Sequence, residues 1–374
     1  MRRRLLVSAL AGLLLAGAMM LLLPRFGETG GRRQTFSPVL PAPTGPYDVG
    51  VRRMLLTDTA RSDPWRPDEH RTVMLDVHYP AAAGRTPLAY YAVAQDMTEL
   101  GSLAWAPGEE RRLGLRPDDV NWMFRTHAHE WAPPAAGSFP VLIGSAPPGV
   151  MRTAYGGIAE ELASHGYAVV TVDHPYDAPV VELFPTRRVI RPSGATRTPN
   201  RAAADAARAA DIGSVLRRLD RLDPELRATV DLRRVGLFGW AGTSRGTLAA
   251  LAALPGVSAM ASIGVAPYAR AGPADPPALV IGDEPDSGPA RRATVSVPGA
   301  TARAFTDDGV ILAQVAARYP ATAARVRQDV GEVQPLAYRT VRRYLVAFFD
   351  VRLRNVPPVP SLPEPGVTVQ PVAP

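Results

Sequence analysis

The central and C-terminal parts of the chain alternate short apolar runs with longer segments that carry an apolar stripe at helical spacing. Continuous apolar runs are typical of strands in a parallel sheet, which is covered on both faces. Ile212, Val215, Leu219 and Leu222 form one such stripe, typical of a core-facing helix. This alternation predicts an α/β fold, a doubly wound and mostly parallel sheet. We expect strands at 140–143, 167–172, 234–240, 259–265, 277–281 and 293–297, and helices at 155–165, 201–222, 247–254 and 338–353.

Upstream of this alternation, Val51–Leu56 and Val73–Tyr79 contain β-branched residues and partly alternate, which predicts an antiparallel strand pair joined by a polar turn at 61–69. Residues 84–138 show no clear period and predict a cap-like insertion. We therefore expect one α/β domain over 47–355. The flanking segments, a tether at 25–46 and a tail at 356–374, are rich in proline or glycine and are not expected to build a core.

The N-terminus carries three arginines, Arg2 to Arg4, ahead of an uncharged run at residues 5–23. A helix over this run would span about 28 Å, the thickness of a bilayer core. Basic residues stay on the cytoplasmic side. Residues 1–24 therefore predict a signal anchor, and a single-pass protein of the cell membrane whose domain lies outside the cytoplasm. The alternative is a cleaved signal peptide and a secreted protein.

Composition excludes several classes of partner. The chain has 42 basic and 35 acidic residues, and every basic residue is an arginine. The arginines are scattered along the chain and form no stripe, so we expect no nucleic-acid partner. The absence of cysteine excludes disulfides and thiolate metal sites. His127, His129 and Glu130 are candidate metal ligands, but their spacing is short and no further cluster completes a site, so an ordinary polar loop accounts for them better. We expect no metal and no cofactor.

One string carries a catalytic signal. Gly242-Thr243-Ser244-Arg245-Gly246 follows the strand that ends at Phe238-Gly239 and precedes an Ala-rich predicted helix. Gly-x-Ser-x-Gly between a strand and a helix is the nucleophile elbow, a strained turn that needs glycines where the backbone is crowded. Ser244 is therefore a candidate nucleophile.

Further strings resemble the α/β-hydrolases, in particular the plasma-type platelet-activating factor acetylhydrolases and their bacterial relatives. The resemblance implies an α/β-hydrolase fold and descent from a secreted or membrane-linked esterase that acts on short acyl chains of phospholipids. It rests on the strings Pro43-Thr44-Gly45-Pro46-Tyr47-Asp48-Val49-Gly50, Asp63-Pro64-Trp65, His78-Tyr79-Pro80, Ala163-Ser164-His165-Gly166-Tyr167, Val172-Asp173-His174-Pro175, Arg234-Val235-Gly236-Leu237-Phe238-Gly239, Val297-Pro298-Gly299-Ala300 and Phe305-Thr306-Asp307.

The catalytic positions depart from that family. Laid residue on residue without a gap, the resemblance places Ala241 in the nucleophile position, Ala266 in the acid position and Ala302 in the histidine position. The oxyanion region becomes Ala146, Pro147 and Gly242, and a proline has no amide hydrogen to donate. A register shifted by two or three residues would instead put Ser244 at the elbow.

Histidine positions weigh against catalysis in either register. Chain order in α/β-hydrolases is nucleophile, acid, then histidine, whereas no histidine follows position 174. We interpret His165 as a helix C-terminal residue and Asp173-His174 as a hydrogen-bonded turn. The alternative for Asp173-His174 is a ligand site, because the pair follows the carboxyl end of a predicted strand. The sequence therefore predicts a membrane-tethered, non-catalytic α/β-hydrolase relative that binds a lipid or a small ester ligand. The alternative is a carboxylic ester or phospholipid acyl hydrolase that uses Ser244.

Overall fold

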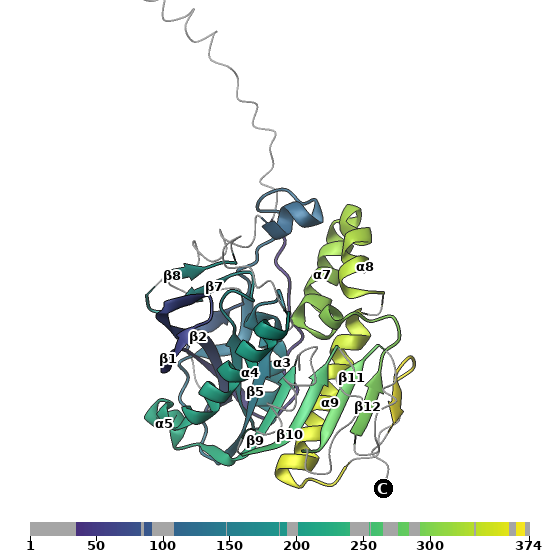
Figure 1. Ribbon diagram of the computed structural model, residues 1–374. Coiled ribbons are helices and arrows are strands. Elements are labelled where there is room, and N and C mark those ends of the chain that lie inside the picture. The colour runs from purple at the N-terminus through teal and green to yellow at the C-terminus, as the bar shows by residue number, and fades with distance from the viewer. Residues whose placement is uncertain are drawn as a thin grey trace, which may run out of the picture. The chain divides into compact units, whose positions relative to one another are not determined.

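The structure is a computed structural model of the 374-residue chain. It describes residues 35–83, 86–91, 108–146, 148–186, 188–192, 201–239, 254, 256–264, 276–283, 292–332, 334–358 and 364–370. The chain divides into two compact units, Met1–Thr35 and Phe36–Pro374. The fold described below is that of the second unit (Figure 1).

A mixed sheet forms the centre of the domain. In the described residues it has 11 strands in the order β13-β12-β11-β10-β9-β5-β6-β2-β1-β4-β3. Strands β12 to β6 of that order run parallel, as the continuous apolar runs predict. The strands are β1 Asp48–Asp63, β2 Arg66–Ala81, β3 Leu88–Tyr90, β4 Arg125–Glu130, β5 Phe139–Ser145, β6 Ala168–Asp173, β9 Val230–Gly239, β10 Val257–Ile263, β11 Ala278–Gly282, β12 Arg292–Ser296 and β13 Thr368–Gln370. A separate two-stranded sheet pairs β7 Val181–Leu183 with β8 Arg188–Ile190.

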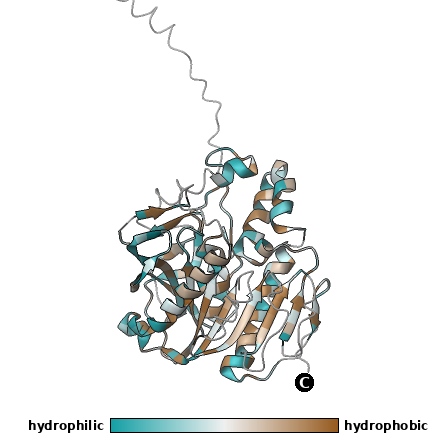
Figure 2. Cartoon of the chain, in the orientation of Figure 1, coloured by the Kyte–Doolittle hydropathy of each residue, from teal (hydrophilic) through white to brown (hydrophobic). Residues whose placement is uncertain are grey.

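Helices cover both faces of the sheet. Leu142, Phe238 and Ile281 point to one face and share a hydrophobic cluster with α3, α7 and α9, whereas Ile143 and Leu237 point to the other and pack with α4. Alternate strand residues thus enter two cores, and the central strands are the most apolar part of the molecule (Figure 2). The helices are α3 Gly156–Ser164, α4 Arg201–Arg217, α5 Pro224–Arg227, α7 Asp307–Arg318, α8 Ala323–Val330 and α9 Gln334–Arg354, with 3-10 turns at Arg152–Tyr155, Leu219–Arg221, Ala302–Phe305 and Pro320–Thr322.

The predicted strand pair at the start of the domain is confirmed. Strands β1 and β2 pair antiparallel, and β2 continues the sheet by pairing antiparallel with β6. Both strands are longer than predicted, and the turn between them shrinks to Pro64 and Trp65. The polar residues at the far end of this hairpin stay in the ladder because pairing does not require apolar side chains.

Three segments differ from the sequence-based expectation. The predicted tether joins the domain from residue 36 onward, because Phe36 bridges to Val120 and Leu40 is only 2% exposed. Within the predicted cap, β3 and β4 extend the edge of the main sheet beside β1. In the predicted tail, β13 pairs antiparallel with β12. Each segment is held by main-chain pairing or a single buried side chain, which leaves little periodicity in the sequence.

No helix in the described part of the chain is long and apolar enough to cross a bilayer. The predicted anchor at residues 5–23 and the predicted helix at 247–254 both lie outside the described residues.

Candidate functional site

The carboxyl ends of the parallel strands meet at one edge of the sheet, where α/β folds bind their ligands. Ser145, the last residue of β5, pairs in register with Gly239, the last residue of β9. Gly239 has φ of 110°, and a Cβ there would lie 2.3 Å from the Ser145 carbonyl oxygen. Only glycine fits this point, because any side chain would overlap the end of β5. The sequence candidates beyond it, Ala241, Gly242 and Ser244, lie outside the described residues, as does Pro147.

The position that the resemblance assigns to the histidine lies at this same edge. Ala302 begins a 3-10 turn just after β12. A Cβ built on Gly264, which follows β10, would lie 2.5 Å from the Ala302 Cβ. The acid position, Ala266, continues the chain from Gly264 but lies outside the described residues. The fold therefore brings the histidine position beside the end of the strand that leads to the acid position, and the residue there has only a methyl group.

A buried serine, histidine and aspartate form a hydrogen-bonded chain at the edge. Nε2 of His174 lies 3.0 Å from Oγ of Ser145, and Nδ1 of His174 lies 3.0 Å from Oδ2 of Asp211. Ser145 ends β5, His174 follows β6 and Asp211 comes from α4. All three residues are buried. Sequence analysis identified only His174 of these three.

The hydrogen-bond partners of His174 and Ser145 determine which of their atoms donate a proton. The Asp211 carboxylate only accepts, so Nδ1 of His174 carries the proton that is donated to Asp211. Nη1 of Arg208 donates to Oγ of Ser145 over 3.0 Å. The Ser145 hydroxyl is then free to donate to the unprotonated Nε2 of His174. This is the tautomer and the direction of donation found in a serine–histidine–acid triad.

Electrostatic interactions keep His174 neutral and Asp211 ionised at neutral pH. Burial lowers the pKa of His174, the positive charge of Arg208 lowers it further, and together they outweigh the hydrogen bond to Asp211. Burial alone would raise the pKa of Asp211, but the Arg71 guanidinium and the His174 hydrogen bond hold it well below its ordinary value. Arg71 contacts Asp211 through Nη2 at 2.7 Å and Asp63 through Nη1 at 2.9 Å. His174 is therefore neutral beside an ionised Asp211.

Ala146, which the sequence assigns to the oxyanion region, follows β5 and is buried. Its carbonyl oxygen accepts a hydrogen bond from Nη1 of Arg208 over 2.6 Å. Arg208 thus contacts both Ser145 and Ala146 and fixes the backbone where β5 ends.

The turn predicted at Asp173-His174 has partners well beyond the loop that follows it. Asp173 forms an ion pair with Arg152, and Arg152 also pairs with Asp76 at 2.9 Å. His78 lies in the same cluster, where burial and two guanidinium groups lower its pKa to about 4 despite the attraction of Asp76. Arg152, in the 3-10 turn after β5, thereby links the end of β6 to the neighbouring strand β2 by ion pairs.

The remaining candidates have structural partners. The ring of His127 lies 2.9 Å from the Leu40 carbonyl oxygen, and that of His129 lies 2.6 Å from the Thr86 carbonyl oxygen. The described residues contain no group of three or more acidic, histidine or cysteine side chains that could hold a metal. His165 forms the C-cap of α3, as predicted.

Tryptophans of the predicted cap divide between core and surface. Trp122 is buried in the core, whereas Trp131 is exposed and lies over the Arg52 guanidinium. Trp105 lies outside the described residues.

Sequence reasoning missed Ser145 and Asp211. The available signal was Asp211 itself, an acidic residue directly before Ile212 in the apolar stripe of α4. A carboxylate in a core-facing stripe needs a buried partner. The sequence does not say which strand end supplies that partner.

Comparisons with known proteins agree with this architecture. A family profile for platelet-activating factor acetylhydrolase, isoform II, matches residues 35–187. A probable 1-alkyl-2-acetylglycerophosphocholine esterase of Arthroderma benhamiae is 29% identical over 162 residues, which is 39% of this chain and 39% of that protein. The crystal structure of a ferulic acid esterase from Streptomyces cinnamoneus superposes with a TM-score of 0.70 at 28% identity and covers 88% of this chain and 98% of that one. The chain thus has an α/β-hydrolase fold and resembles platelet-activating factor acetylhydrolase.

Proposed function

We propose that this chain is a membrane-tethered α/β-hydrolase relative that binds a lipid or a small ester without hydrolysing it. The observation that carries the proposal is Ala302. It lies against Gly264 at the carboxyl edge of the sheet, in the position that the resemblance assigns to the general base. A serine hydroxyl without a base stays protonated at neutral pH and is a weak nucleophile.

The positions of the six histidines support this proposal. All six are among the described residues, so the surroundings of each can be compared with the candidate site. His70 is exposed on the hairpin, and His78 lies within the buried ion-pair cluster. His127 and His129 contact backbone carbonyls, and His165 contacts Glu161 at the opposite end of α3 from the edge. Five of the six therefore cannot serve a nucleophile that follows Gly239.

His174 favours a second candidate, an ester hydrolase. Its unprotonated Nε2 contacts Ser145, which is paired with Gly239 at the start of the predicted elbow. In this candidate, His174 would accept the proton of a nucleophile, which is Ser244 in the shifted register or Ser145 itself. Burial of Ser145 and its hydrogen bond from Arg208 count against its reaching a substrate.

The test is covalent labelling with a fluorophosphonate, together with hydrolysis of p-nitrophenyl acetate and butyrate by the full-length chain in detergent. We expect neither labelling nor turnover above a heat-denatured sample. A labelled peptide that contains Ser244 or Ser145 would establish the hydrolase instead and identify its nucleophile.

A gain-of-function variant tests the register. The triple variant Ala241→Ser, Ala266→Asp, Ala302→His should gain weak fluorophosphonate labelling, because triad members act as a unit. The matched control carries Ala302→Gln in place of Ala302→His and should gain none, since it lacks the imidazole. Equal labelling of both variants would show that Ala302 is not in the position of the base.

The membrane tether is proposed from residues 5–23 alone. A reporter fused after Pro374 should be active outside the cytoplasm and remain in the membrane fraction after a carbonate wash. A reporter active only in the cytosol would contradict this orientation. A mature N-terminus near Phe26 would instead show a cleaved signal and a secreted protein.

A further inference from the structure

A cavity of about 740 Å³ lies away from the strand edge, on the outer side of the helices α3, α7 and α9. Its remaining wall comes from the segment Pro41–Thr44, which runs ahead of β1, and from Glu364, which precedes β13. This volume lies within the range of about 300–1,000 Å³ typical of small-molecule sites. Ser145, His174 and Ala302 do not line it, so it is separate from the candidate site described above.

The walls of this cavity are apolar in the middle. Val310 and Ala313 contribute from α7, Val346 and Pro335 from α9, and Pro41 from the segment before β1. Such a surface gains free energy by covering hydrocarbon and offers no directional partner to a polar molecule. A ligand that fills it therefore carries an apolar chain.

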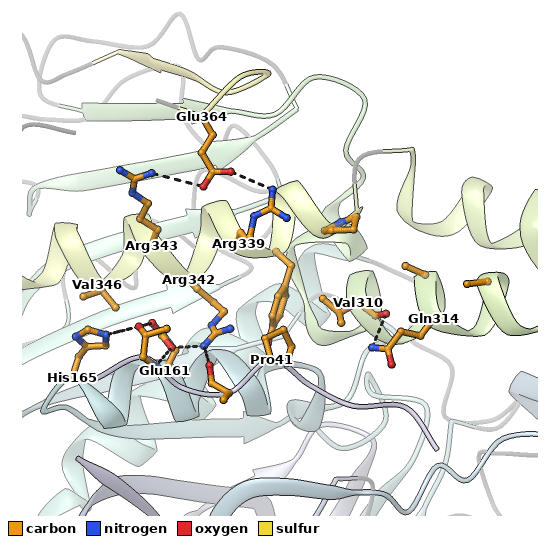
Figure 3. A pocket seen from close by; sticks show the side chains of 16 residues that line it. Pro41, Glu161, His165, Val310, Gln314, Arg339, Arg342, Arg343, Val346 and Glu364 are labelled. Atoms are coloured by element: carbon orange, nitrogen blue, oxygen red, sulfur yellow. Dashed lines mark hydrogen bonds and ion pairs between the residues drawn. The ribbon is translucent and has the colours of Figure 1, made fainter. Parts of the chain in front are cut away.

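Charged groups flank the apolar wall on both sides of α9 (Figure 3). On one side Arg339 and Arg343 point to Glu364, at 3.2 and 3.7 Å. On the other side Arg342 pairs with Glu161, which also lies 3.3 Å from Nε2 of His165. The lining thus holds three arginines against two glutamates, and the excess positive charge complements an anionic group.

The arginine on the inner side is incompletely satisfied. Nη2 of Arg342 donates to Glu161 and, over 2.7 Å, to the Ala42 carbonyl oxygen. The Arg342 side chain is only 8% exposed. Its Nε is buried and has no hydrogen-bond partner among the described residues. A buried donor without a partner is costly, so a native structure normally supplies one from the protein, from water or from a ligand.

From these observations we propose that the cavity between α3, α7, α9 and Pro41–Thr44 binds a single-chain amphiphile with an anionic head group. The apolar chain lies along Val310, Ala313 and Val346, and the head group lies among the arginines of α9. The inference rests on the proposed function, because it identifies the ligand of a binding protein and places it outside the family's catalytic edge.

The experiment is displacement of 11-(dansylamino)undecanoic acid from the full-length chain, followed by fluorescence. Palmitate and lysophosphatidic acid should displace the probe, and hexadecanol should need at least ten-fold more, because it lacks the anionic group. Palmitate and lysophosphatidic acid differ in head group, so their ratio identifies a carboxylate or a phosphate source. Equal displacement by hexadecanol would overturn the charge argument.

Two variants locate the site. Ala313 is half-buried on α7, and Ala313→Phe should fill the cavity and weaken probe binding at least ten-fold with unchanged thermal unfolding. Arg343→Gln should weaken binding of the anionic ligands about three- to ten-fold. The matched control is Arg352→Gln, an exposed arginine on the same helix outside the cavity, and it should leave binding unchanged.

Probe binding that neither Ala313→Phe nor Arg343→Gln weakens would place the ligand elsewhere and overturn this inference, while leaving the proposed function intact. Absence of probe binding would overturn it as well. Failure of the proposed function has a separate signature, which is fluorophosphonate labelling or ester turnover by the unmodified chain.

Discussion

Asp211 offers the sharpest test of the buried hydrogen-bonded chain. Four donors converge on its carboxylate: Nη2 and Nε of Arg71 at 2.7 and 3.1 Å, Nδ1 of His174 at 3.0 Å and Nη1 of Arg61 at 3.1 Å. Asp211→Asn keeps the shape of the side chain, removes its negative charge and turns one acceptor oxygen into a donor. At least one of these donors then faces an amide N–H.

The magnitude follows from burial. Arg71 and Asp211 are 1% and 0% exposed, and removing one partner of a buried ion pair costs about 3–5 kcal/mol because the other charge is left uncompensated. Asp63 stays within reach of Arg71 and places the loss toward the lower end of that range. With an unfolding entropy of about 2.1 cal/mol/K per residue, a unit of about 340 residues loses about 4–7 °C in Tm.

The assay is thermal unfolding followed by tryptophan fluorescence, with near-UV circular dichroism at 20 °C to show that the variant is folded before heating. The control is Glu69→Gln, which removes one charge from an ion pair with Arg188 whose side chains are 42% and 46% exposed. Solvent screens such a pair, and the control should lose less than about 1 kcal/mol. If Asp211→Asn lowers Tm no more than this control does, water reaches the cluster and the reasoning is refuted.

Three further predictions test other parts of the structure. Burial lowers the pKa of His78 from 6.5 to about 4, so the unfolded chain binds the additional proton between these values. The free energy of unfolding should therefore fall by about 3 kcal/mol on account of His78 as the pH drops from 6.5 to 4, with no such loss above pH 6.5. Urea titrations of His78→Gln should show a smaller fall over the same pH range. Leu40→Ala should cost about 2–4 kcal/mol in urea unfolding, since Leu40 is buried; a loss under about 0.5 kcal/mol would instead fit a loose tether. Gly264→Ala should cost more than about 2 kcal/mol, because its φ is 82° and its Cβ would overlap Ala302, whereas a Cβ at Gly282 meets no atom of the described residues within 4 Å and Gly282→Ala should be near neutral; equal losses would contradict the packing at Ala302.

Two elements were missed by the sequence analysis for different reasons. Helix α7 was not predicted, although Thr306 caps it and Asp307 and Asp308 occupy its first turn. Phe305-Thr306-Asp307 was interpreted only as a family motif and not as the start of a helix. Strand β13 was missed because three residues with half-exposed or exposed side chains carry no period, and only the free edge of β12 holds them in place.

The sequence by itself determined the class of the fold. Apolar runs and helical stripes are properties of neighbouring residues, so they predicted the parallel strands and the long helices α4 and α9 within about five residues. They also predicted the pairing of β1 and β2, but with both strands too short at the turn. The resemblance assigns Ala302 to the histidine position, and that assignment stays a prediction.

Only the tertiary structure decided which distant residues meet. Ser145, His174 and Asp211 are separated by 29 and 37 positions, and nothing local to any of them specifies the other two. They converge because β5 and β6 are adjacent and parallel, and because the apolar stripe of α4 packs on the face of the sheet that their strand ends share. The cavity between α3, α7 and α9 has the same origin, since its walls come from three helices and two segments of irregular structure. Periodicity identifies the face that each helix buries, but the neighbour against which it is buried is set by the packing of the whole domain.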